Sequence, residues 1–480
     1  NHLNRLKQTS VVLNARKSSN YLTPTNSTKP RSTHTKENKV LIQIKSESAN
    51  SFNFHDVFAR DSSRPATGRI DPKNTCSDPV RQELKSIEVL PNLTGVIIFG
   101  VAFAIRFILF QFSNITEILG NRVEIVTPVT SFTRLTEGLY LFDNGVPPYD
   151  GGAFHQAPLF LACFQLLSYL PNILIPLTYI IADLFIAYLL ANITRIKQHL
   201  YKDFPRIDVE LDEGKPKEID PWIVSGLYLF NPLTVASCLS RSTLLFTNLS
   251  VVLGTYYSLR NNKSYGMFWI AMATYLSFYP LMLVIPSILM LTNNTNLKGK
   301  RIGNEVYSCA GLYIGWLAGL LILSYLLVDS WDFMQSTYGV ILLLPDLTPN
   351  IGLFWYFFIE MFDQFRSFFL VVFQLHAFIF VVPISIKFRN HPLFVVFLLS
   401  GIMAVFKSYP SIGDASLYLA FLPIYSEIVK WSGNANFFYA ITLVYTVGNI
   451  ILLVDSTFSM LRREFDIWNP ELRHCEITQK

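Results

Sequence analysis

The chain has 480 residues, of which 51% are hydrophobic and only 15% are charged, whereas soluble domains carry about a quarter charged residues. Together with a positive mean hydropathy of +0.34, this composition excludes an ordinary soluble fold and predicts a membrane protein. Residues 1–90 hold 15 basic and 8 acidic side chains, while the whole chain has a net charge of +5. The basic character therefore belongs to a tail and does not indicate a nucleic-acid partner.

The segment 1–90 is rich in Ser, Thr, Asn, Lys and Arg and has few apolar clusters. It buries too little surface to offset its ordering entropy, so we expect a disordered basic tail. The first residue is Asn and not Met, which indicates a fragment, a processed chain or an extension of the gene model. We place a multi-span membrane domain at residues 91–466 and a short polar tail at 467–480.

Apolar runs follow one another from Leu93 onward. Because a helix needs about 20 apolar residues to cross a bilayer, we expect an all-α bundle of about eleven or twelve membrane segments. Several of them contain proline and should be kinked or broken. The expected segments are 94–112, 156–171, 173–193, 222–239, 243–259, 266–282, 283–293, 306–328, 366–386, 392–406, 414–428 and 437–455.

Lysine and arginine in the short loops predict the orientation of these segments. The loop 195–217 contains six basic side chains and should face the cytosol, as should residues 298–301 and 387–389. The loop 113–155 holds more acids than bases and should be luminal.

With these orientations, segments 156–171 and 173–193 cannot both cross the membrane. We therefore expect the first of them, which ends at Pro171, to be a re-entrant or interfacial helix.

Three charged side chains interrupt the apolar runs. An unpaired Asp183 would cost roughly 3 kcal/mol or more in the bilayer, so it should make a structural contact inside the bundle or contact a lipid head group. Arg106 should snorkel or pair within the bundle, and Arg241 poses a similar question. The five cysteines form no CxxC pair or Cys/His cluster, so no metal site, disulfide framework or cofactor is predicted.

Several stretches resemble the PIG-U family over about residues 92–466, and the longest of them is PDLTPNIGLFWYFFIEMF at 345–362. The others are 122–128, 137–149, 154–159, 406–410, 413–414, 433–442 and 461–464. PIG-U proteins are multi-span subunits of the glycosylphosphatidylinositol (GPI) transamidase, which cuts a C-terminal signal from a proprotein and joins the new carboxyl group to a GPI anchor.

The resemblance implies a multi-pass protein of the endoplasmic reticulum membrane with a bundle like that of the C-type glycosyltransferases (GT-C). It also implies a subunit without catalytic residues of its own, because in this family the cutting Cys and His belong to a separate caspase-like subunit. The implied role is to hold the complex together with the other transamidase subunits and to help bind the GPI lipid. The family has a further span between Pro423 and Gly433, where only Ile424–Ser432 stands here, so a span or an exon is missing.

The alternative function is a GT-C mannosyltransferase of GPI assembly that uses a dolichol-phosphate sugar. Active GT-C enzymes hold two close carboxylates in the corresponding luminal loop. The luminal acids of this chain form no D-x-D or E-x-D pattern, which favours a lost transferase site. They are Glu117, Glu124, Glu137, Asp143 and Asp150. A transporter ranks last, because no inverted repeat is apparent.

Aromatic side chains crowd residues 329–366, and we predict an amphipathic surface helix at Phe354–Phe365. Trp355 and Phe358 would form either an interfacial aromatic belt or the wall of a groove for lipid or a partner helix, and the resemblance favours the groove. His155, assigned to the same groove, is more typical of an interfacial hydrogen-bonding group than of a ligand.

Asn434 and Asn436 precede the apolar run that opens with Phe437, Phe438 and Tyr439. Asn is a good helix N-cap, so the simplest interpretation is that these two residues cap the helix that follows. Two amides in front of a helix N-terminus also suit a phosphate or sugar hydroxyl. The matching Asn-x-Asn pair of the family lies at the anchor-binding site, so the resemblance favours contact with the GPI head group, with the three aromatic residues packing acyl chains.

The loop 195–217 is predicted to be cytosolic because its basic side chains oppose translocation. A cysteine introduced at Gln198 should react with an impermeant maleimide from the cytosolic side of sealed microsomes. Labelling from the luminal side would reverse the orientation of every later segment.

Overall fold

The computed structural model describes residues 92–150, 152–200, 219–293 and 300–425, together with isolated residues between 443 and 462. Contacts divide the chain into residues 1–54 and 55–480, and all described residues belong to the second unit. Within them all regular secondary structure is helical, which confirms the predicted all-α class. The predicted anchor-binding residues lie outside the described ranges: Asn434, Asn436, Phe437, Phe438 and Tyr439.

The helices follow one another with short connections. They are α2 (Leu93–Gln111), α3 (Ser113–Gly120), α4 (Phe132–Asp143), α5 (Pro158–Ser168), α6 (Leu174–Leu200), α7 (Pro221–Leu229), α8 (Pro232–Leu239), α9 (Leu244–Leu259), α10 (Lys263–Leu276), α11 (Val284–Asn293), α12 (Lys300–Val328), α13 (Asp332–Met334), α14 (Val340–Leu343), α15 (Phe354–Glu360), α16 (Asp363–Ile379), α17 (Val381–Lys387), α18 (Pro392–Phe406) and α19 (Ile412–Phe421). Short turns of other helix types are η3 (Tyr279–Leu283), η4 (Gln335–Gly339) and η5 (Leu422–Tyr425).

Local sequence signals explain where several helices begin. The side chain of Asn92 accepts a hydrogen bond from the first turn of α2, and Asn262 does the same for α10. Asp220 and Asn231 cap α7 and α8 in this way, and a proline occupies the first position of each of these two helices.

Four helical stretches are long and apolar enough to cross a membrane alone: α2, α6, residues 302–328 of α12, and residues 363–387 of α16 and α17. The pair α7 and α8 meets the same test together but is bent by 55°. Five further apolar helices have only 10–17 residues. The expected segments up to residue 425 therefore form helices, but four or five of them are long enough to span, because prolines such as Pro232 and Pro280 divide the apolar runs.

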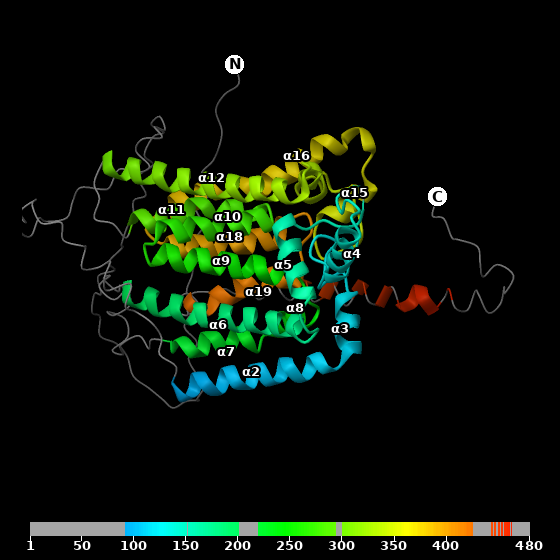
Figure 1. Cartoon of the computed structure of the whole chain (residues 1–480), viewed down its shortest axis with the longest axis horizontal. Helices are drawn as coiled ribbons and strands as arrows, with labels where there is room; N and C mark the ends of the chain where they lie inside the picture. Colours follow the sequence, from blue (N-terminus) through cyan, green and yellow to red (C-terminus); the bar gives the residue numbers. More distant parts are fainter. Residues whose placement is uncertain are drawn as a thin grey trace, which may run out of the picture. The chain divides into compact units, whose positions relative to one another are not determined.

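The long helices lie side by side in one bundle (Figure 1). Helix α10 packs between α9 and α12, and α6 packs against α2, α7 and α9. Most of the buried apolar side chains join into one continuous core across these helices. The bundle therefore holds together through helix–helix packing, and its ends are left for loops.

One end of the bundle contains Lys197 and residues 387–389, and we call it the basic end. The amide of Asn293 donates to the carbonyl of Arg389 at 2.6 Å, which joins the ends of α11 and α17. The Lys197 ammonium donates to the carbonyl of Ile424 at 2.7 Å and lies 4.0 Å from the ring centre of Tyr425. The described residues of the segments that the sequence assigns to the cytosol thus come together at one end.

The opposite end, which we call the loop end, carries residues 112–157 and 329–362 (Figure 1). Helix α5 lies here and has 11 residues. At 1.5 Å per residue it is about 16 Å long, roughly half the thickness of a hydrocarbon core. This length agrees with the predicted re-entrant or interfacial helix.

The predicted single helix over Phe354–Phe365 is wrong, because α15 ends at Glu360 and α16 begins at Asp363. Met361 has extended backbone angles, and this turns the chain back on itself. The turn lets Phe354 and Phe358 of α15 pack against Phe373 of α16, with ring centres 5.1 and 5.4 Å apart. Aromatic packing between the two helices thus overrides the continuous helical pattern.

A buried ion pair fixes three helices inside the bundle. Arg106 of α2 contacts Asp183 of α6 with an Nη2–Oδ2 distance of 2.6 Å, and both side chains are fully buried. The Tyr228 hydroxyl of α7 donates to the other carboxylate oxygen at 2.7 Å, and Arg106 donates to the Leu229 carbonyl at 2.9 Å. The structure therefore shows that Asp183 and Arg106 pair inside the bundle, and not that Asp183 contacts a lipid head group or that Arg106 snorkels.

Replacing one partner of this pair should destabilise the fold strongly. Asp183→Asn leaves a buried guanidinium without a counter-charge, which should cost about 3–5 kcal/mol in the free energy of unfolding. The double change Arg106→Met with Asp183→Leu removes both charges and should recover most of that loss. Unfolding of the purified chain in detergent measures both effects. Asp220→Asn is the matched control, since Asn also caps a helix; equal losses in Asp183→Asn and this control would contradict the assignment.

Candidate functional site

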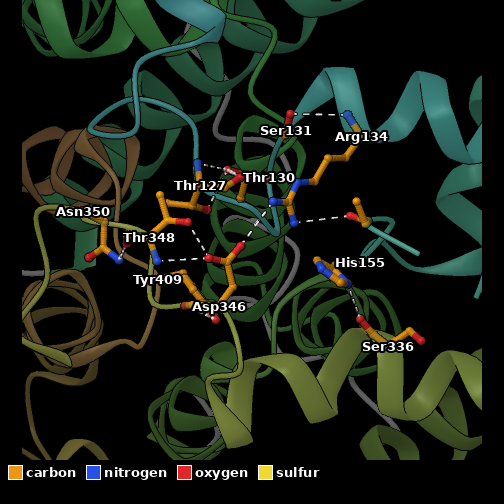
Figure 2. A network of polar contacts seen from close by, with 11 residues as sticks. Thr127, Thr130, Ser131, Arg134, His155, Ser336, Asp346, Thr348, Asn350 and Tyr409 are labelled. Atoms are coloured by element: carbon orange, nitrogen blue, oxygen red, sulfur yellow. Dashed lines mark hydrogen bonds and ion pairs between the residues drawn. The ribbon is translucent and has the colours of Figure 1, made fainter. Parts of the chain in front are cut away.

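A network of polar contacts at the loop end joins stretches that lie far apart in the sequence (Figure 2). Its centre is Asp346, in the loop between α14 and α15. One carboxylate oxygen accepts from Arg134 of α4 at 3.2 Å, and the other accepts from the backbone N–H of Thr348 at 3.0 Å. The hydroxyl of Tyr409, which precedes α19, donates to the Asp346 carbonyl at 2.8 Å.

The loop that carries Asp346 has a strained start. Leu344 has a φ of 50°, a left-handed conformation that non-glycine residues rarely adopt, and it stands directly before Pro345. Arg366 of α16 donates to the Leu344 carbonyl at 2.7 Å and so holds this conformation. At the other end of the loop, a Cβ added to Gly352 would lie 2.6 Å from the Pro410 side chain, so only glycine fits there.

The contacts of Asp346 keep its carboxyl group ionised. Partial burial by itself raises the pKa of this group, but the hydrogen bonds from Thr348 and Arg134 and the charge of Arg134 outweigh it, so the pKa is lowered. Burial and the charge of Asp346 together raise the pKa of Tyr409, which therefore remains a neutral donor. The network is thus an ionised acid held by donors, and not a proton-exchanging pair.

His155 belongs to the same end of the bundle and contacts η4. Its Nδ1 lies 3.0 Å from the Ser336 carbonyl oxygen, to which it can only donate. Burial, and next the charge of Arg134, lower the pKa of His155, so its ring is neutral at physiological pH. The Ser336 hydroxyl in turn donates to the Tyr149 carbonyl at 2.9 Å. These contacts make His155 a structural hydrogen-bonding group.

A cavity of 30 Å³ lies between His155 and the start of α9. This volume accommodates one or two water molecules. Gln156 lines it with a buried side-chain oxygen that has no hydrogen-bond partner, and Lys407 lines it from beyond α18. No carboxylate lines this cavity. Its other polar lining residues are Thr130, Thr243, Thr247, Tyr275, Ser277, Thr337 and Tyr338.

Lys407 is bound on its other side, where its ammonium donates to Asp414 at 2.8 Å. The second carboxylate oxygen of Asp414 accepts from the Ser411 backbone N–H at 2.9 Å and begins α19. This carboxylate is therefore also fully used by structural contacts.

The five acids that the sequence predicts to be luminal are exposed and scattered along residues 117–150, and they form no D-x-D or E-x-D pattern. Asp143 accepts from Gln165 at 2.8 Å. Over the described ranges no group of three His, Cys, Asp or Glu side chains could hold a metal ion.

An aromatic groove of 390 Å³ opens along α15 and α16. Of the two aromatic residues singled out from the sequence, Phe358 is buried beneath the groove, with the guanidinium of Arg366 5.7 Å from its ring centre. Trp355 is half-buried and packs edge-on against Tyr356. The groove is lined by Leu353, Tyr356, Phe357, Glu360, Met361, Phe362, Phe365 and Phe369. His155 is not among its lining residues.

Sequence reasoning missed Arg134, Arg366 and Tyr409, which hold the loop in place. The only local signal is Asp346-Leu-Thr348, a pattern typical of a turn in which an Asp side chain accepts from the backbone two residues later. The partners lie on α4, α16 and the segment before α19, and no spacing in the sequence brings them together.

Comparison with known proteins adds three findings. The family described as "GPI transamidase subunit PIG-U" matches residues 100–432. A human protein named GPI-anchor transamidase component PIGU is 35% identical over 410 residues, covering 77% of this chain and 94% of the human protein. A protein of Saccharomyces cerevisiae named GPI transamidase component GAB1 is 34% identical over 400 residues, with the same two coverages of 77% and 94%. The family match ends at residue 432, next to the place where the sequence predicts a missing span.

Removal of the Asp346 side chain should loosen the loop end. Asp346→Ala removes the acceptor of three hydrogen bonds, from the Arg134 guanidinium and from the backbone N–H and the hydroxyl of Thr348. This should lower the free energy of unfolding by about 1–3 kcal/mol at pH 7. Because the pKa of Asp346 is lowered in the fold, its contribution is complete above the ordinary aspartate pKa of about 3.9 and is lost as the pH falls through the lowered value.

The stability difference between Asp346→Ala and the unchanged chain should therefore shrink as the pH falls below about 4. Chemical unfolding at pH 7, 5 and 3 measures it. Asp332→Ala is the matched control, since its exposed side chain bonds only to Ser330. An equal loss in the two variants at pH 7 would refute the network's role.

Proposed function

This chain belongs to the PIG-U family of GPI transamidase subunits, and on this basis we propose that it is a non-catalytic subunit that holds the complex together and helps to bind the GPI lipid. The chain is a membrane protein with four or five candidate spans. We place it in the endoplasmic reticulum membrane. Its partners are then the other transamidase subunits, including the caspase-like subunit that carries the catalytic Cys and His.

The main support for a non-catalytic role is the lining of the 30 Å³ cavity beside His155. It is polar, yet it contains no carboxylate and no thiol that could act as a base or nucleophile. Two acids of this end, Asp346 and Asp414, each accept from a cationic side chain and from a backbone N–H. Carboxylates used in this way stabilise the fold and are not available to a substrate.

A mannosyltransferase is the second candidate, since the expected GT-C-like bundle is shared with such enzymes. That chemistry needs two carboxylates that converge within a few ångströms. The acids of residues 117–150 are exposed and scattered, which argues against a mannosyltransferase. The relatives are named as transamidase components, which does not favour that function either. The subunit role is therefore the better supported of the two.

The aromatic groove supports a lipid-binding or partner-binding role for α15 and α16. Several of its residues are large apolar side chains that remain exposed, among them Tyr356 at 59% and Phe362 at 75%. Stiff aromatic rings offer large contact areas at low entropic cost. We propose that an acyl chain or a neighbouring transmembrane helix covers this groove, with Trp355 at its margin and Phe358 supporting it from below.

Asn434 and Asn436 are the residues that we propose to contact the GPI head group. Each amide supplies two donors and one acceptor, which match phosphate oxygens and sugar hydroxyls. Loss of one hydrogen bond to a charged group should cost roughly 1.5–3 kcal/mol, or ~10–150-fold in affinity. Phe437, Phe438 and Tyr439 would pack the first part of the acyl chains.

In cells that lack the native subunit, this chain should restore surface display of a GPI-anchored reporter and should co-purify with the other transamidase subunits. Asn434→Ala with Asn436→Ala should reduce display while co-purification remains, because the head-group contact is lost and the complex is intact.

Asn→Ser at both positions separates binding from helix capping, since Ser caps a helix as well as Asn does. Full display with Ser but not with Ala would mean that these residues only cap a helix. Failure of the unchanged chain to co-purify with any transamidase subunit would overturn the subunit role itself.

A further inference from the structure

Arg241 differs from the other cationic side chains that are drawn into the bundle. Those side chains donate to protein acceptors: Arg106 to Asp183, Arg134 to Asp346, Lys407 to Asp414, Arg260 to the Tyr256 hydroxyl, Arg366 to the Leu344 carbonyl and Lys197 to the Ile424 carbonyl. Arg241 makes no side-chain hydrogen bond or ion pair with the described residues, and its Nε is buried without a partner. Its charge is thus uncompensated within this part of the protein.

The guanidinium of Arg241 is partly covered and held in place by an aromatic ring. Its central carbon lies 5.3 Å from the ring centre of Phe132, at the start of α4. Burial lowers the pKa of Arg241, although the group remains charged at any physiological pH. The Phe132 ring covers one face of the guanidinium. An anion can therefore bind at the guanidinium edge, where the N–H donors lie in one plane.

The backbone of Arg241 is held in a conformation that favours glycine. Its φ is 55°, in the left-handed region that costs a side-chain-bearing residue free energy. The turn is fixed on both sides, because the Arg241 N–H donates to the Cys238 carbonyl at 3.1 Å and the Thr243 N–H donates to the Thr130 carbonyl at 3.0 Å. Glycine would make this turn at lower cost, so the arginine side chain contributes something other than the turn.

A second unpartnered polar group lies beside Arg241. The Tyr179 hydroxyl of α6 is fully buried and has no hydrogen-bond partner among the described residues. The Phe132 ring contacts both residues, with its centre 6.3 Å from that of Tyr179. Buried polar groups usually have partners in folded proteins, so an unpartnered guanidinium N–H with an unpartnered hydroxyl beside the same Phe132 ring indicates a ligand that supplies acceptors.

The position of Arg241 indicates where that ligand comes from. The residue directly follows α8, the second half of the bent span, and precedes α9, so it lies at the loop end where the apolar segments stop. The head groups of a bilayer begin where the apolar parts of its spanning helices end, and arginine is the side chain best suited to bind their phosphates. An uncompensated cation favours a lipid with net negative charge over a zwitterionic one.

We propose that Arg241 binds the phosphate group of an anionic membrane phospholipid at the loop end, with Phe132 and Tyr179 positioning the guanidinium. This site goes beyond the proposed head-group contact at Asn434 and Asn436, and it stands on different residues. Tyr179 and Phe132 act through Arg241, and Arg241 is the residue that touches the phosphate.

Arg241→Gly gives the sharpest test, because glycine suits the backbone of the turn while the guanidinium is lost. The full chain is placed in nanodiscs of phosphatidylcholine that contain a photo-crosslinkable phosphatidylinositol. We expect crosslinking to the unchanged chain and a loss of ~10-fold or more in Arg241→Gly. We also expect the thermal midpoint of Arg241→Gly to stay the same or rise, whereas a purely structural arginine would lower it.

Two further variants complete the test. Arg241→Lys keeps the charge but not the planar fork and should retain part of the crosslinking. Arg260→Gln at the basic end is the matched control and should crosslink like the unchanged chain, because Arg260 already has the Tyr256 hydroxyl as acceptor. Equal crosslinking in Arg241→Gly and the unchanged chain would overturn the proposal. Stabilisation of the chain by millimolar inorganic phosphate, with no crosslinking to the lipid, would assign the site to free phosphate and refute the lipid.

Discussion

The Asp346 carboxylate joins two stretches that are 212 residues apart, because Arg134 of α4 donates to it while Thr348 donates from the same turn. The other contacts that hold the loop lie beside this position: Tyr409 donates to the Asp346 carbonyl, and Arg366 donates to the carbonyl of Leu344, two residues before it. A left-handed residue before a proline is costly, and it persists only where its surroundings over-determine it. One ionised acid and its donors therefore set the geometry of the loop end.

Carboxylates inside the bundle are likewise held by cationic side chains and other donors. Asp183 is shared by Arg106 and Tyr228, and Asp414 is shared by Lys407 and the first turn of α19. In an apolar environment an acid must be paired to remain ionised, and pairing removes it from chemistry. A fold that uses its interior carboxylates as structural ties fits a subunit that binds and positions better than one that transfers groups.

Two features of the loop end remain as candidate ligand-binding sites. The groove between α15 and α16 is apolar and aromatic, whereas Arg241 presents an uncompensated positive charge at the level where the apolar segments stop. The groove suits acyl chains or a helix, and Arg241 suits an anionic head group. The lipid-binding role proposed above would use both kinds of surface, and the described residues supply them on separate elements.

The sequence by itself determined the all-α membrane class and the family, because apolar runs, basic loops and the stretch 345–362 are local properties of the chain. It also located Asp183 and Arg106 as charges in need of partners. Only the tertiary structure decided that these two pair with each other, that the run 354–365 breaks at Met361, and that Phe358 faces inward. It alone showed Arg241 without an acceptor. These outcomes depend on which helices become neighbours, and contacts such as that between Arg106 and Asp183, 77 residues apart, leave no periodicity in the sequence from which to infer them.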